Sequence, residues 1–138
     1  MSDITKISLV DLVTNIKNKS ISCEEVTSAY INRINKSKKL NCYIESDFEQ
    51  AINKAKSLDK KSDKNKKLFG APIAVKDLFC TKNLQTTASS KILKGFKPQY
   101  ESTVTSKLWD EDAILLGKLN CDEFAMGSSN ETSFYGNV

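Results

Sequence analysis

A lone lysine at the end of a short apolar run is the residue best suited to chemistry in this chain of 138 residues. Within the segment 70–79, the β-branched Ile73 and Val75 indicate a buried strand, and Lys76 follows at its end. A lysine has a pKa of about 10.4 in water and becomes a base near neutral pH only where desolvation disfavours its charge. Lys76 is therefore a candidate general base. The alternative is a strand-end lysine that reaches solvent or pairs with Asp77.

Several other kinds of site are disfavoured by residue type and spacing. The chain has no histidine, so neither a Ser-His-Asp triad nor a histidine metal site can form within it. Its four cysteines include no Cys-x-x-Cys pair, which favours thiols in a reducing compartment over zinc ligands or disulfides. These cysteines are Cys23, Cys42, Cys80 and Cys121. No Gly-x-x-x-x-Gly-Lys-Ser/Thr loop for ATP is present.

The net charge of +4 arises from many lysines and a single arginine, Arg33. Specific recognition of phosphates or bases usually employs arginine. We therefore favour compositional bias over a nucleic-acid surface. The densest lysine run, 60–67, is interpreted as a solvated linker rather than an RNA contact.

Three amphipathic helices are predicted in the first part of the chain, 1–58. Ser8 and Ser22 are each followed by an acidic residue three positions later, which is typical of helix starts. A third helix is expected to open at Asp47. Its predicted buried residues are Phe48, Ala51, Ile52, Ala55 and Leu58.

An α/β part is predicted beyond a lysine-rich linker at 59–67. Strands are expected at 73–75 and 113–119, with a further short one at 42–44. Between the two longer strands, Ser102 can cap a helix whose apolar residues are Val104, Leu108 and Trp109. A strand, a helix and a second apolar strand favour a parallel crossover within the region 68–138. A short helix at 122–126 should end at Gly127.

The segment 127–130 contains small polar residues that fit two interpretations. Glycine after a short helix is a common cap, and serine and asparagine favour turns. The same residues could line a substrate pocket, which makes Ser128 and Ser129 candidates for substrate binding.

Segments at 70–79, 88–93, 100–104 and 117–133 together resemble the amidase signature family, and within it the glutamine-hydrolysing subunits of tRNA-dependent amidotransferases. The family pattern Gly-x-Pro-x-x-x-Lys-Asp is matched by Gly70, Pro72, Lys76 and Asp77. The resemblance implies that residues 1–138 are the amino-terminal portion of an amidase signature domain. The implied fold class is α/β, with amino-terminal helices followed by part of a mixed β-sheet core.

The resemblance also implies a Ser–cis-Ser–Lys triad, in which Lys76 is the catalytic lysine and Ser128 and Ser129 lie in the substrate pocket. Both triad serines lie downstream of the matched region in this family. We therefore expect this chain to lack them and to be inactive alone. No metal or cofactor is expected in the chain.

The activity implied for the full-length protein is glutamine hydrolysis that supplies ammonia to convert Glu-tRNA(Gln) or Asp-tRNA(Asn) to Gln-tRNA(Gln) or Asn-tRNA(Asn). The implied partners are the amidotransferase subunits B and C, with ATP and Mg²⁺ on the first of these and charged tRNA bound by the complex. The start of the chain lacks the features of a secretory signal and no apolar stretch has the length of a membrane span, so we expect a cytoplasmic protein. Two alternatives remain open: another amide hydrolase of the same family, or a non-catalytic helical docking module.

Overall fold

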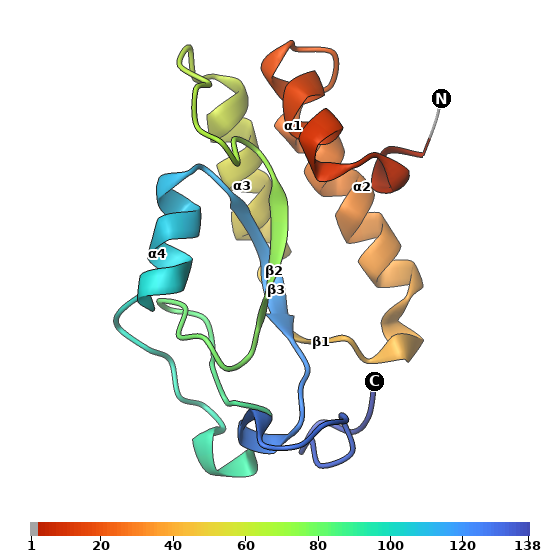
Figure 1. The fold of residues 1–138 in the computed structure, drawn as a ribbon, viewed down its shortest axis with the longest axis vertical. Helices are drawn as coiled ribbons and strands as arrows, with labels where there is room; N and C mark the ends of the chain where they lie inside the picture. Colours follow the sequence, from red (N-terminus) through yellow and green to blue (C-terminus); the bar gives the residue numbers. More distant parts are fainter. Residues whose placement is uncertain (1–2) are drawn as a thin grey trace.

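Helices surround a small mixed sheet in the computed structural model, which describes residues 3–138 (Figure 1). The α-helices are α1 (Leu9–Lys17), α2 (Cys23–Lys36), α3 (Phe48–Asp59) and α4 (Thr103–Asp110). The strands are β1 (Tyr43–Glu45), β2 (Pro72–Lys76) and β3 (Ile114–Leu119). Short 3-10 turns are η1 (Ile4–Lys6), η2 (Lys38–Leu40), η3 (Lys91–Leu93) and η4 (Glu123–Ala125).

The central strand of the sheet is β3, which pairs with β1 on one side and β2 on the other. The β2–β3 pairing is parallel and the β1–β3 pairing is antiparallel, so the predicted parallel crossover is confirmed. Because β1 comes from the predicted helical part of the chain, a single sheet joins both parts. The register shifts between Ile73 and Ala74, where a bulge in β3 brings Gly117 opposite Ala74.

Local capping signals position the helices as the sequence predicts. Ser8, Ser22, Asp47 and Ser102 cap α1, α2, α3 and α4, each accepting a hydrogen bond from a backbone N–H three residues later. At α2 the capping box is complete, because the Glu25 carboxylate also accepts from the Ser22 N–H.

The hydrophobic core lies where α1, α2 and α3 meet the sheet. It contains Leu12 and Ile16 of α1, Cys23 and Val26 of α2, Ala51, Ala55 and Leu58 of α3, and Phe69 and Ile114 beside them. Gly70 has a φ of +74°, and a Cβ there would lie 2.6 Å from Cys23 Sγ, so only glycine fits just before β2. On the opposite side of the strands from α1 and α2 lies α4 (Figure 1).

In α4, Val104 is half exposed and the buried residue is Thr105, because this short helix packs through a polar contact to Cys80 O. Two details of the predicted burial and helix pattern are wrong. In α3, Phe48 and Ile52 are only partly buried. The expected helix at 122–126 is only the turn η4, since Phe124 has a positive φ of 55° that interrupts it.

The lysine-rich run at 60–67 is exposed except for the half-buried Lys64, as predicted, but hydrogen bonds from two of its residues attach it to the fold. Lys61 donates hydrogen bonds of 2.8 and 2.9 Å to both carboxylate oxygens of the buried Asp112, and the Lys67 N–H donates to Glu111. The linker is thus attached to the chain just before β3. Among residues 3–138, no helix combines the length and apolar character that crossing a bilayer requires.

Candidate active site

Lys76 lies at the carboxyl end of β2, in register with Leu119 at the end of β3. Its carbonyl oxygen accepts a 3.1 Å hydrogen bond from the Phe79 N–H, which turns the chain directly after the strand. The side chain is partly buried, and its Nζ has no hydrogen-bond or ion-pair partner within residues 3–138. An amine in this position is available to a reacting group.

The neighbouring Asp77 is fully buried and organises the loop that follows the strand. One carboxylate oxygen, Oδ2, accepts hydrogen bonds from the Thr87 hydroxyl at 2.6 Å, from the Thr87 N–H at 2.9 Å and from the Ser89 N–H at 3.3 Å. The Asp77 backbone N–H donates to Leu119 O, and its carbonyl accepts from the Ala88 N–H. Asp77 therefore connects the end of β2 to β3 and to the loop at 86–90.

Two consecutive residues of this loop, Ala88 and Ser89, have positive φ values of 49° and 53°. This left-handed region costs roughly 1–2 kcal/mol for a residue with a Cβ. The conformation is held by the Asp77 contacts and by hydrogen bonds from the Phe124 and Phe134 N–H groups to the two loop carbonyls. Such strain, maintained by many contacts, is a common feature of functional loops.

A second lysine, Lys118 of β3, has the fully buried surroundings that Lys76, which is only partly buried, does not have. Its side chain is 0% exposed. Its ammonium donates hydrogen bonds to Phe79 O at 2.6 Å, Thr86 Oγ1 at 2.7 Å and Thr81 Oγ1 at 3.2 Å. Asp77 Oδ1 lies 3.5 Å away and has no hydrogen-bond partner of its own within the described residues. Burial lowers the pKa of Lys118 from 10.5, and the nearby Asp77 acts in the opposite direction.

The sequence around Lys118 carries a signal like that around Lys76. The apolar run 113–119 includes one lysine near its end, the same pattern that singled out Lys76. The strand register, together with the alternation of side chains between the two faces of the sheet, places the two lysines on opposite faces. Lys118 pairs with Val75, so it lies on the same face of the sheet as Asp77, whereas Lys76 lies on the other face.

The two serines proposed for the substrate pocket lie in an exposed loop after β3. Ser129 Oγ donates a 3.0 Å hydrogen bond to Glu131, and the Gly127 N–H donates to the Asp122 carboxylate, which closes a turn. No hydrogen bond joins Ser128 or Ser129 to Lys76 within residues 3–138. Because β2 and β3 are parallel, the loop that follows β3 starts at the same end of the sheet at which Lys76 lies. The pocket role of both serines stays a prediction.

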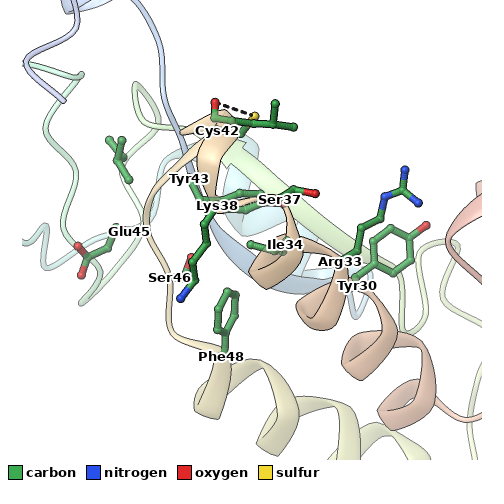
Figure 2. A pocket seen from close by; sticks show the side chains of 12 residues that line it. Tyr30, Arg33, Ile34, Ser37, Lys38, Cys42, Tyr43, Glu45, Ser46 and Phe48 are labelled. Atoms are coloured by element: carbon green, nitrogen blue, oxygen red, sulfur yellow. Dashed lines mark hydrogen bonds between the residues drawn. The ribbon is translucent and has the colours of Figure 1, made fainter. Parts of the chain in front are cut away.

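A cavity of about 560 Å³ lies away from Lys76, between the carboxyl end of α2, the strand β1 and Phe48 at the start of α3 (Figure 2). Aromatic and aliphatic side chains line most of it, together with Arg33, Lys38 and Glu45. Within residues 3–138, no three His, Cys, Asp or Glu side chains are grouped so that they could hold a metal ion.

Comparison with known proteins identifies the family. The family model described as Amidase matches residues 25–138. The chain belongs to the amidase family. The predicted fold class is confirmed, because solved structures of amidase enzymes share this helical and mixed-sheet arrangement.

The similar curated proteins are named as amidotransferase subunits. The chain is 66% identical over all 138 residues to the glutamyl-tRNA(Gln) amidotransferase A subunit of Pelagibacter ubique, and 51% identical to the protein of the same name from Parvibaculum lavamentivorans. It spans 28% of the length of each relative and is covered completely by both.

Among solved structures, the peptide amidase from Stenotrophomonas maltophilia matches 96% of this chain with a TM-score of 0.84 and 26% identity, over 29% of its own length. A fatty acid amide hydrolase matches the whole chain with a TM-score of 0.89 over 26% of its length, and at 21% identity this similarity shows the fold alone.

Proposed function

We propose that this chain is the amino-terminal part of the glutamine-hydrolysing A subunit of a tRNA-dependent amidotransferase. The observation that carries the proposal is the 66% identity, over every residue of the chain, to a glutamyl-tRNA(Gln) amidotransferase A subunit. The full-length protein would release ammonia from glutamine for the conversion of Glu-tRNA(Gln), or Asp-tRNA(Asn), to the amidated product. The amidotransferase subunits B and C would be its partners, with ATP and Mg²⁺ on the first of these and charged tRNA bound by the complex in the cytoplasm.

In this proposal Lys76 is the general base. A neutral Lys76 amine would accept a proton relayed through one serine, so that a second serine could attack the side-chain amide carbon of glutamine. The C–N bond would then break and ammonia would leave, with a proton returned to it from the base. Water would hydrolyse the resulting ester. We assign both serines to the part of the relatives' length that this chain does not cover.

Two features support this role for Lys76. The amine lies at the carboxyl end of a strand in a parallel pair, the edge of an α/β sheet where ligands usually bind. Its Nζ is not committed to any hydrogen bond within the described residues, while the buried ion pair of the region belongs to Lys118 and Asp77. A base whose proton must move needs this freedom.

The test is glutaminase turnover by the full-length protein, assembled with its partner subunits, for the wild type, Lys76→Ala and Lys76→Arg. We expect Lys76→Ala to lower kcat about 100- to 10,000-fold, as is usual for a lost general base. Lys76→Arg should fail as well, because a guanidinium stays protonated. Melting temperatures should change little, since the Nζ makes no contact that holds the fold.

Near-normal turnover by Lys76→Arg would refute the base role and return Lys76 to an ordinary strand-end lysine. Hydrolysis of a peptide or fatty amide in preference to glutamine would favour the other amide hydrolase within this family. Purified residues 1–138 serve as a further control, and we expect them to release no ammonia from glutamine above the level of their own Lys76→Ala variant.

A further inference from the structure

The ion pair between Lys118 and Asp77 lies entirely out of contact with solvent, and sheet formation alone does not require it. An apolar pair of similar volume is often at least as stable as a buried ion pair, because desolvation of two charges offsets their attraction. Breaking such a pair by removing one partner, in contrast, leaves an uncompensated buried charge. Because the ion pair lies beside the candidate base, it points to a role in holding the backbone around Lys76 in place.

The contacts of the pair converge on the backbone around Lys76. Before Lys76, Val75 is held in register with Lys118 itself. After it, the Asp77 N–H donates a 2.9 Å hydrogen bond to Leu119 O. The turn that follows is closed by the Phe79 N–H on Lys76 O, and the carbonyl of the same Phe79 accepts the 2.6 Å hydrogen bond from Lys118 Nζ.

The pair also fixes the two segments that surround this turn. Lys118 holds the hydroxyls of Thr81 and Thr86, and Asp77 holds Thr87 and the strained Ser89. The three ammonium protons therefore have three acceptors from three different residues, with the Asp77 carboxylate balancing the charge. A neutral, apolar side chain at position 118 would leave these three acceptors without a donor.

We propose that Asp77 and Lys118 are positioning residues that hold the backbone on both sides of Lys76, so that its amine is presented from the opposite face of the sheet in a fixed place. The proposal rests on the proposed function of Lys76 and goes beyond it, since neither Asp77 nor Lys118 touches the reacting atoms. Catalysis is sensitive to such support, because misplacement of a catalytic group by about 1 Å can cost about a hundredfold in rate.

The experiment uses the full-length, assembled protein and compares Lys118→Met, Asp77→Asn and the double variant. Lys118→Met should lower kcat by about a hundredfold. It should leave KM within about threefold, because the amine acts after binding. In the double variant, the amide oxygen introduced by Asp77→Asn can still accept from Thr87 and Ser89, and no buried charge remains. We therefore expect about tenfold recovery of kcat relative to Lys118→Met.

A matched control is the ion pair of Lys61 with the buried Asp112, which lies just before β3, at the other end from Lys76. Lys61→Met breaks a lysine–aspartate contact and should leave kcat unchanged. A second readout does not depend on activity: amide hydrogen exchange, measured by mass spectrometry, should speed up in peptides covering 76–90 in Lys118→Met, and not in Lys61→Met.

Unchanged kcat in Lys118→Met, an equal loss in Lys61→Met, or unchanged exchange at 76–90 would each overturn the positioning role. If Lys118→Met does not fold, kcat and hydrogen exchange of Asp77→Asn and of the double variant are compared with the wild type instead. A wild-type protein that does not hydrolyse glutamine would instead refute the proposed function. The exchange measurement would then decide on the positioning role by itself.

Discussion

The ammonium group of Lys118 is fully buried, so the free energy of unfolding should depend on pH. Burial lowers its pKa below the usual 10.5. The nearby Asp77, Cys80 and Glu101 act in the opposite direction but do not cancel the effect. The unfolded chain therefore binds more protons than the folded one in the pH window between the lowered pKa and 10.5, so this group makes unfolding less favourable as pH rises through that window.

Thermal melts of the wild type and Lys118→Met in the full-length protein measure this effect. The wild type should gain melting temperature relative to Lys118→Met as pH is raised toward 10.5, because the buried group then loses its charge. Other lysines titrate equally in both proteins and cancel in the difference. A difference that stays constant or moves the other way would show that Lys118 has no lowered pKa.

Among the elements, α2 and α3 are joined by a cap that comes from outside the capped helix. Asp59, the last residue of α3, accepts hydrogen bonds from Cys23 N–H at 2.7 Å and Glu24 N–H at 3.1 Å, in the first turn of α2. Its negative charge also lies at the positive end of the α2 dipole. Together with Ser22, Asp59 satisfies backbone donors that would otherwise have no partner.

Asp59→Ala should therefore lower the free energy of unfolding by about 1–2 kcal/mol, the usual cost of a lost helix cap. Chemical denaturation of the full-length protein measures the change. Asp110→Ala is the control, because Asp110 is an exposed residue at the end of α4. If both substitutions changed the free energy of unfolding equally, the loss of a negative charge, rather than the loss of the helix cap, would account for the effect of Asp59→Ala.

Elements whose signals are local could be predicted from the sequence, and those that depend on distant partners could not. Ser22 and Asp47 cap their helices because the capping bonds span only three residues. The turn η4 escaped prediction because Phe124 is held at a positive φ, while its N–H donates to the distant Ala88 O. Likewise, the different surroundings of Lys76 and Lys118 follow from the register of two strands far apart in sequence, which no local pattern encodes.

At the scale of the whole molecule, the described residues form a sheet with an open edge on each side. Both β1 and β2 have β3 as their single neighbour within residues 3–138. Large apolar side chains are also exposed, with Val10, Ile92 and Met126 each more than three-quarters accessible. Open strand edges and apolar surface both promote association.

Residues 1–138 expressed alone should therefore self-associate at micromolar concentration. Light scattering coupled to size-exclusion chromatography measures the mass directly. A lysine introduced into the edge strand β2 at the partly buried Ile73, Ile73→Lys, should reduce the associated fraction, since charges on an edge strand oppose strand pairing. A monomeric mass for the unsubstituted chain across the concentration range would contradict the expectation.

The central position of β3 in the sheet has a consequence for folding during synthesis. During synthesis β1 and β2 leave the ribosome first, and within residues 3–138 the strand that both pair with, β3, emerges only later. The stretch between Lys76 and Ile114 takes roughly two to seven seconds at about 5–20 residues per second. For that interval the nascent chain carries two unpaired strands, and the core formed by α1, α2 and α3 lacks Ile114 of β3. A chaperone that binds nascent chains would find its best target in this period.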